Sequence, residues 1–210
     1  MIESLLIPKE DITTIPESLN CRDALMILED ADQRCAPVVD ASNSLFRGNI
    51  YKYHIYKYAF HHPQEDLGQV SVTNLLKNSS RIVHIQDSLH TLLFTIRDLP
   101  YIPVLDQNHH FVGVVYHGDF TSYLSKAWEG QSPYVIRVEL NDIIRDLHRI
   151  LKIAHRYLTY SSLLTFKATP LNPHPFVMIT LDKATDPIKI NTLVSVLNRK
   201  GYLAKSLKTY

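Results

Sequence analysis

The sequence predicts an α+β protein in which a duplicated segment of strands and helices precedes a separate unit of alternating strands and helices. Two observations indicate the duplication. The stretch CAPVVDASNSLFRGNIYKYHIYKY (Cys35–Tyr58) corresponds to YIPVLDQNHHFVGVVYHGDFTSYL (Tyr101–Leu124), and upstream TIPESLNCRDALMILED corresponds to HIQDSLHTLLFTIRD. A third observation, a change of pattern after Gly130, indicates the separate unit.

Each copy of the duplicated segment reads as strand–helix–strand–strand–helix. A short strand reaches an acidic residue followed by Ser-Leu, and Ser18 and Ser88 are the predicted N-caps of the helices that follow. A buried strand then carries Pro37 or Pro103, a polar turn follows, and the last strand ends on a tyrosine. Apolar residues recur at helical spacing: Ala24, Leu25 and Leu28 in the first copy, and Leu92, Leu93 and Ile96 in the second.

The segment after Gly130 predicts the order β-α-β-β-α-β, which is the ferredoxin-like arrangement. VIRVEL, SSLLTFKA, PFVMITLDK and YLAKSLKTY are the predicted strands. Asp186 and Pro187 are the expected N-cap and first residue of the last helix, and Gly201 suits its C-terminal end. The predicted inner faces of the two helices are Ile143, Ile144, Leu147, Ile150, Leu151 and Ala154, and then Ile190, Leu193, Val194 and Leu197.

These patterns divide the chain into four segments. Residues 1–60 and 73–130 hold the two copies, and residues 131–210 hold the ferredoxin-like unit. Residues 61–72 are polar and carry Pro63 and Gly68, which is typical of a linker.

Composition excludes several classes of protein. A formal net charge of +1 argues against a large basic surface for nucleic acid. No apolar run approaches the length of a membrane span, and the N-terminus has no signal-peptide pattern. The two cysteines, Cys21 and Cys35, match no disulfide framework or metal spacing. A soluble, cytoplasmic protein is therefore expected.

No catalytic or metal-binding pattern stands out. The six glycines form no phosphate-binding loop, and no nucleophile motif is present. The adjacent histidines 61–62 and 109–110 cannot readily face one ion together, so we expect exposed loops there. The sequence predicts a protein that is not an enzyme and that needs no metal or cofactor.

The duplicated motifs resemble a tandem pair of CBS motifs (a Bateman module) from about Leu5 to Leu124. The resemblance depends on the APVVD and IPVLD strands, each of which is followed by a second strand and by a helix with a polar first turn. Residues 131–210 resemble an ACT domain, although the turn Glu139–Asp142 lacks the glycine common in amino-acid-binding members. The overall layout is similar to the acetoin-utilisation regulators. The duplicated half looks closer to the cyclic-di-AMP-binding CBS proteins of Gram-positive bacteria, through LLIPKEDI, RDLPYIPVLD and FVGVVYHGDF.

This resemblance implies two clefts where the copies meet, with adenine read beside the Pro-Val strands. The usual family ending, Gly–x–x–Thr/Ser–x–x–Asp, keeps its aspartate as Asp119 in the second copy, whereas His54 takes that place in the first. Tyrosine replaces the small hydroxyl residue in both copies, where it could stack on a base. The alternatives are that Tyr51 and Tyr116 pack beneath helices and that Asp119 is a helix cap. The predicted ligand-binding residues are Thr14, Ala36, Pro37, Tyr51, Lys52, His54, Arg97, Tyr101, Ile102, Pro103, Tyr116, His117 and Asp119.

The resemblance further implies a non-enzymatic regulator that binds an adenine nucleotide, foremost cyclic di-AMP. It also implies a homodimer and a regulated protein partner, for which an enzyme of alarmone metabolism is the extrapolation. Two alternatives stay open. One is an AMP- or ATP-responsive regulator of the acetoin type, and the other is an amino-acid sensor whose CBS pair only dimerises.

Overall fold

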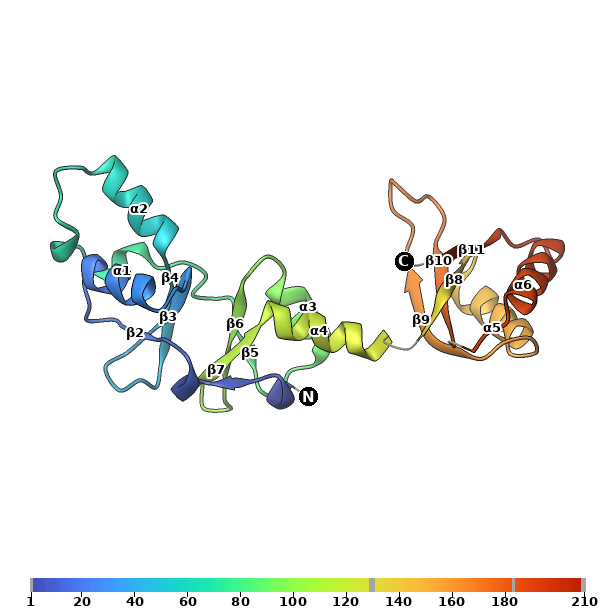
Figure 1. The fold of residues 1–210 in the computed structure, drawn as a ribbon, viewed down its shortest axis with the longest axis horizontal. Coiled ribbons are helices and arrows are strands. Elements are labelled where there is room, and N and C mark those ends of the chain that lie inside the picture. Colours follow the sequence, from blue (N-terminus) through green and yellow to red (C-terminus); the bar gives the residue numbers. More distant parts are fainter. Residues whose placement is uncertain (1, 129–130, 183, 209–210) are drawn as a thin grey trace. The chain divides into compact units, whose positions relative to one another are not determined.

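The computed structural model describes residues 2–128, 131–182 and 184–208, and it is mixed α+β as predicted (Figure 1). Contacts between residues divide the chain into two compact units, Met1–Tyr123 and Leu124–Tyr210. The first unit contains both copies of the duplicated segment, and the second contains the ferredoxin-like fold.

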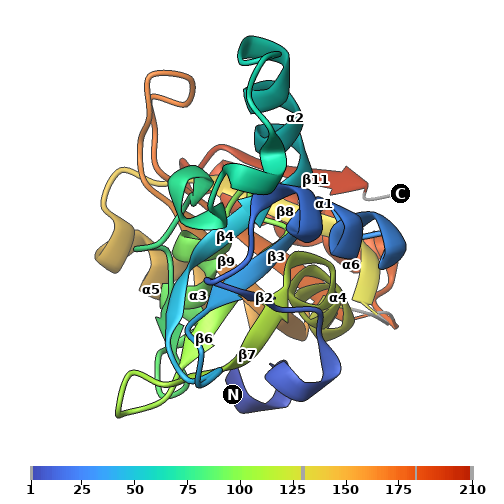
Figure 2. The ribbon, with the colours of Figure 1, turned by 90° about the vertical axis from the view of Figure 1, so that its left-hand side faces the viewer.

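The first copy forms a three-stranded sheet of order β2-β3-β4 with its helices (Figure 2). β2 is parallel to β3, and β3 is antiparallel to β4. Ile15, Ala24, Leu28 and Val38 belong to the core of this copy. Its elements are β2 (Ile15–Pro16), α1 (Cys21–Asp30), β3 (Cys35–Val39), β4 (Phe46–Tyr51) and α2 (Lys52–His61).

The second copy repeats this topology and adds one strand, giving a sheet of order β1-β7-β6-β5. Its elements are β5 (Val83–His84), α3 (Leu89–Ile96), β6 (Tyr101–Leu105), β7 (Phe111–Tyr116) and α4 (His117–Trp128). The remaining elements of this unit are the 3-10 turns η1 (Ile2–Ser4), η2 (Lys9–Asp11), η3 (Leu67–Gln69) and η4 (Val72–Leu75), and the added strand β1 (Ile7–Pro8).

The two copies exchange the short segments that precede them. β1 comes before the first copy in sequence, yet it pairs with β7 of the second copy, Ile7 opposite Val114. Lys77 comes before the second copy, yet it forms an isolated bridge with Asn49 on β4 of the first copy. Each copy is therefore completed by a segment that continues into the other.

Helix capping confirms one predicted N-cap and corrects the other. Ser88 caps α3, because its hydroxyl accepts a hydrogen bond from the N–H of Thr91 at 3.1 Å. The prediction for Ser18 was wrong. α1 begins later, at Cys21, and the side-chain oxygen of Asn20 accepts from the N–H of Asp23 at 2.9 Å.

The second unit is an antiparallel sheet of order β11-β8-β10-β9, which confirms the β-α-β-β-α-β prediction. Both helices lie on the same face of this sheet (Figure 1). Asp186 caps α6 and Pro187 is its first residue, as expected. The elements are β8 (Gln131–Glu139), α5 (Ile143–Ala154), β9 (Tyr160–Phe166), β10 (Phe176–Asp182), α6 (Pro187–Arg199) and β11 (Ala204–Lys208).

The inner face of α5 differs from the predicted one at two positions. Ile144 was expected in the core but its exposed fraction is 86%. Asp146 is buried instead, and its Oδ2 accepts hydrogen bonds from the N–H groups of Asn141 (2.9 Å) and Asp142 (3.0 Å). These bonds hold the turn that leads from β8 into α5 and keep the pKa of Asp146 below its ordinary value.

Removing the side chain of Asp146 should destabilise the second unit. Asp146→Ala leaves two amide groups of this turn without their acceptor, which we expect to cost about 1–3 kcal/mol of unfolding free energy. Because the folded pKa is lowered, the contribution is present above the ordinary Asp pKa and is lost as pH falls through the folded value. Urea unfolding at neutral and acidic pH measures both effects, with the exposed Asp182→Ala as control. Equal losses in the two variants would contradict this role.

The exchange of segments depends on two glycines. Gly113 and Gly48 both have φ +152°, and a Cβ on Gly113 would lie 2.1 Å from the carbonyl oxygen of Ile7, which is backbone. A Cβ on Gly48 would lie 3.2 Å from Cβ of Leu76, a tight contact that a shift of a few tenths of an ångström relieves. Gly113→Ala should therefore displace β1 and lower stability, whereas Gly48→Ala should cost about 1–3 kcal/mol for the backbone conformation alone. Thermal unfolding of the matched pair measures the difference, and a Gly48 variant as unstable as the Gly113 variant would contradict it.

Candidate functional site

A cavity of about 670 Å³ opens in the N-terminal unit where the two copies meet. The starts of β3 and β6 and the ends of β4 and β7 form its wall. The cavity size is within the range of small-molecule sites. Its lining residues are Gln33, Arg34, Cys35, Tyr51, Lys52, Tyr53, Asp98, Leu99, Pro100, Tyr101, Tyr116, His117 and Gly118.

Both copies contribute equivalent positions to this wall. The pairs Gln33/Leu99, Arg34/Pro100 and Cys35/Tyr101 precede or begin the Pro-Val strands. The pairs Tyr51/Tyr116, Lys52/His117 and Tyr53/Gly118 end the last strand of each copy and begin the helix after it. The register is the same in both copies, because Cys35 lies opposite Tyr51 and Tyr101 lies opposite Tyr116. An approximate local two-fold axis therefore relates the lining residues of one copy to those of the other.

Basic side chains belong to the lining of the cavity. The Lys52 ammonium pairs with Glu29 at 3.0 Å, whereas the Arg34 guanidinium has no ion-pair or hydrogen-bond partner within the described ranges, although the Arg34 carbonyl oxygen accepts from the Lys52 N–H at 3.0 Å. His117 Nδ1 donates to the carbonyl oxygen of Leu99 at 3.3 Å, which leaves its Nε2 available. The one carboxylate in the wall, Asp98, pairs with Arg81 at 2.9 Å. The Arg34 guanidinium can therefore pair with an anionic group in the cavity without giving up an existing ion pair.

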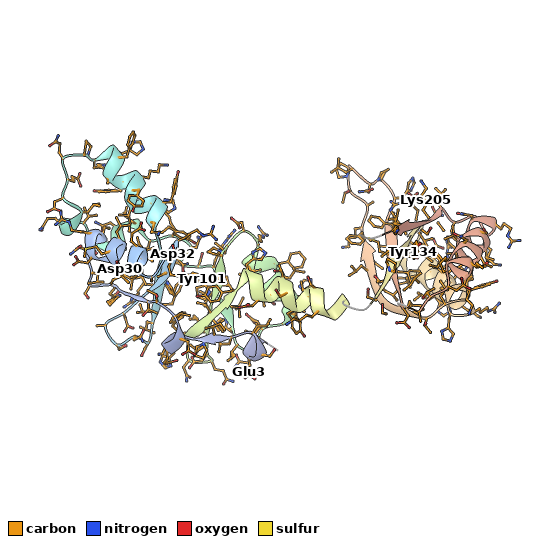
Figure 3. All side chains as sticks on the ribbon, in the orientation of Figure 1. Glu3, Asp30, Asp32, Tyr101, Tyr134 and Lys205 are labelled. Atoms are coloured by element: carbon orange, nitrogen blue, oxygen red, sulfur yellow. The ribbon has the colours of Figure 1, made fainter. Side chains whose placement is uncertain are left out.

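Three tyrosines form the aromatic part of the wall. The Tyr101 hydroxyl donates to Oδ1 of Asn49 at 2.6 Å, and the Tyr51 hydroxyl accepts from Nδ2 of Asn78 at 3.0 Å. The rings of Tyr101 and Tyr116 meet edge to face with centroids 6.0 Å apart. Burial raises the pKa of Tyr101 well above its ordinary value, so the hydroxyl stays protonated and remains a donor. Figure 3 labels Tyr101 within the N-terminal unit.

Cys35 lies beside the Tyr101 hydroxyl and is itself buried. Burial raises the pKa of this thiol to about 11. The thiol is therefore neutral at physiological pH, and it acts as a small apolar wall residue and not as a nucleophile.

Five of the residues predicted to bind ligand line this cavity together. They are Tyr51, Lys52, Tyr101, Tyr116 and His117. Pro37 borders a second, much smaller cavity of about 10 Å³, whose other walls include Thr13, Cys35, Val114 and Tyr116. Ala36 and Ile102 are buried within strands β3 and β6, and Pro103 lies in the middle of β6 opposite Val114.

The remaining predicted residues lie outside the cavity wall. Asp119 is exposed in the first turn of α4, and Arg97 is exposed with its Nε donating to the carbonyl oxygen of Phe94 at 2.9 Å. His54 contacts the edge of Tyr51 at 5.7 Å between centroids, and burial lowers its pKa. Thr14 is half-buried next to Thr13, which is the residue that reaches the smaller cavity.

Several residues of the wall, among them Arg34 and Cys35, were not among the predicted ligand-binding residues. The signal was available, because Cys35 is the counterpart of Tyr101 in the duplication and Tyr101 was included. Arg34 has no charged counterpart, since Pro100 occupies its place in the second copy. Only the structure shows that this position faces the cavity.

The described part of the chain contains no cluster of three or more His, Cys, Asp or Glu side chains that could hold a metal ion. Within the same residues, no helix combines the length and the apolar character needed to span a membrane. His84 and His109, which lie 3.3 Å apart between ring nitrogens, form a surface pair next to the hairpin of the second copy.

Comparison with known proteins identifies this architecture. The family model of the CBS domain matches residues 67–126, which cover most of the second copy of the duplication. This segment is therefore similar to a CBS domain. The first copy has the same topology, so the N-terminal unit has the fold of a CBS pair. No curated protein matches the chain.

Solved structures of CBS pairs resemble this chain in fold. CbpB of Listeria monocytogenes, in complex with c-di-AMP, has a TM-score of 0.52 at 18% identity over 59% of this chain and 94% of its own. CBSX2, in complex with AMP, has a TM-score of 0.50 at 18% identity over 59% of this chain and 94% of its own. A CBS domain pair/ACT domain protein from Thermotoga maritima has a TM-score of 0.50 at 24% identity over 60% and 97%.

Proposed function

We propose that the CBS pair is a regulatory module that binds an adenine-containing nucleotide, cyclic di-AMP, in the cavity between its two copies. The observation that carries this proposal is the wall of the cavity, in which Tyr51 and Tyr116 occupy equivalent positions and each precedes a basic residue, Lys52 or His117. Tyrosine rings offer a face for adenine, and the adjacent basic residues suit phosphate.

Energetics require both parts of this wall. Burying about 100 Å² of purine and apolar wall contributes about 2–3 kcal/mol at about 25 cal/mol/Å². Micromolar affinity corresponds to about 8 kcal/mol. Phosphate pairing with Arg34, Lys52 and His117 must supply much of the remainder, and the unpaired Arg34 can do so without breaking an existing ion pair.

The repeated wall favours a ligand that is itself repeated. Cyclic di-AMP has two adenines and two phosphates related by a two-fold axis, and the cavity offers two tyrosines and two basic positions in the same relation. The CbpB complex supports this choice, because a protein of the same fold binds c-di-AMP. The CBSX2 complex supports AMP as the second candidate. AMP is smaller and would occupy one half of the cavity.

Regulation would follow from a partner that distinguishes the free and bound states. A ligand shifts such an equilibrium only by its difference in affinity for the two states. The proposal includes a homodimer in the cytoplasm that catalyses no reaction. It also includes a protein partner, for which an enzyme of alarmone metabolism is the candidate to test.

An amino acid bound to the second unit is the less favoured alternative. The turn Leu140–Asp142 is where ACT domains resembling this unit bind amino acids, and its Asn141 and Asp142 N–H groups already donate to the buried Asp146. They are not free to hold a ligand carboxylate.

The nucleotide proposal predicts the effect of removing Arg34. Arg34→Ala should weaken binding of the phosphate-bearing ligand by about 1.5–3 kcal/mol, or roughly 10- to 100-fold, because a charged hydrogen bond is lost. The control is Arg47→Ala, since Arg47 pairs with Glu17 at 2.8 Å outside the cavity wall. Calorimetry with cyclic di-AMP, AMP, ATP and a panel of amino acids measures both variants. Binding of none of the nucleotides to the unmodified protein would refute the proposed function.

A further inference from the structure

The two copies place equivalent backbone positions on the cavity wall and next to it, but these positions carry different side chains. Cys35, Tyr51, Tyr101 and Tyr116 line the cavity, and the positions beside them are not among its lining residues. Each half-site is defined by four positions that the duplication relates. The Asn49 half-site consists of Asn49, Tyr51, Asn78 and Tyr101, and the Val114 half-site consists of Val114, Tyr116, Pro8 and Cys35. The strand pairing fixes this correspondence, because Lys77 bridges to Asn49 as Ile7 pairs with Val114, and Asn78 and Pro8 follow them.

Two hydrogen bonds close the Asn49 half-site. Tyr101 is 5% exposed, and its hydroxyl reaches from β6 across to Oδ1 of Asn49, which is 2% exposed. On the other side, Asn78 donates to the Tyr51 hydroxyl. Moving the Tyr101 ring out of this half-site would leave the buried acceptor of Asn49 without a partner, which is costly.

The Val114 half-site cannot form either bond. Valine offers no acceptor where asparagine stands in the other half, and Cys35 is too short to cross to β7 as Tyr101 crosses to β4. Proline offers no side-chain donor at position 8, and within the described residues the Tyr116 hydroxyl has no hydrogen-bond partner. Tyr116 can therefore turn without losing a hydrogen bond.

The small cavity lies mainly in this second half, because three members of the Val114 half-site line it and Tyr101 alone lines it from the Asn49 half-site. Its volume is about 10 Å³ in the present side-chain arrangement, and Cys35, Val114 and Tyr116 are among its walls. Such a space accepts no more than about one water molecule. Gln33, Cys35, Tyr101 and Tyr116 line both cavities. Of the two tyrosines, only Tyr116 can rotate without losing a hydrogen bond between its hydroxyl and the described residues, so its rotation would join the small cavity to the large one.

We infer that the CBS pair binds one adenine base per chain, in the Val114 half-site. The Tyr116 side chain rotates to admit this base, while Tyr101 permanently fills the Asn49 half-site. This inference rests on the proposed function and adds its stoichiometry and its position. A dinucleotide inserts one base there and leaves the second in the open cavity, so cyclic di-AMP and AMP both bind with one molecule per chain.

Calorimetry with AMP tests the position and number of the bases. The unmodified protein should bind one AMP per chain. The double variant Tyr101→Cys with Asn49→Val gives the Asn49 half-site two side chains of the other half, and it should bind two AMP per chain. Two AMP bound by the unmodified protein, or one bound by the correctly folded double variant, would overturn the inference.

Thermal unfolding without ligand tests the lock independently. Tyr101→Phe removes the hydroxyl bound to Asn49 and should lower the unfolding temperature by about 2–6 °C. Tyr116→Phe is the matched control and should change it by less than about 1 °C, because its hydroxyl has no partner. Equal shifts would overturn the inference even if the double variant fails to fold. If no adenine nucleotide binds the unmodified protein, the proposed function fails, and the unfolding temperatures still decide whether the two halves differ.

Discussion

The exchange of short segments between the two copies is the constraint on which the cleft depends. β1 hydrogen-bonds to β7 of the second copy before the chain enters the first, and Lys77 bridges to β4 before the chain enters the second. The chain therefore crosses the junction between the copies twice. Separating the copies would break backbone hydrogen bonds at both crossings, so the strand ends that form the cavity wall are held at a fixed distance.

The two copies resemble each other more closely in backbone conformation than in the identity of their side chains. Gly48 and Gly113 share φ +152°, and the two hairpins carry Asn43 and His109 at positive φ at corresponding places. In each hairpin the aspartate after the buried strand accepts backbone N–H groups, Asp40 from Ser44 and Leu45 at 2.8 Å and Asp106 from Asn108 and His110 at 2.8 Å. The polar hairpins are thus structural, and they free the opposite strand ends to differ between the copies.

Pattern reasoning predicted the fold well because periodicity and duplication are local signals. The repeated Pro-Val strands and the β-α-β-β-α-β order could both be read without knowing any long-range contact. The failures have a common cause. Ser18 and Asn20 are both good N-caps, and only the folded chain shows which one precedes the helix. Arg34 lines a cavity that residues distant in sequence complete, and Asp146 accepts hydrogen bonds within a single turn. The periodicity of apolar residues predicts neither kind of contact.

Two helices begin on the cavity wall and lead away from it, so they are the elements through which the proposed ligand would act outside the cleft. The exchanged segments hold the strands, so the parts free to respond are the helices that begin on the wall, α2 at Lys52 and α4 at His117. α2 carries Tyr53, Tyr56 and Phe60 with exposed fractions of 66%, 51% and 82%. α4 contains the boundary between the two compact units, after Tyr123. If the proposed nucleotide binds, movements of Lys52 or His117 toward its phosphate would act on the first residues of α2 and α4. A partner that contacts either helix would bind more tightly or more weakly in the presence of the nucleotide. The partner would change the affinity for the nucleotide by the same factor, because coupling between two binding sites is reciprocal.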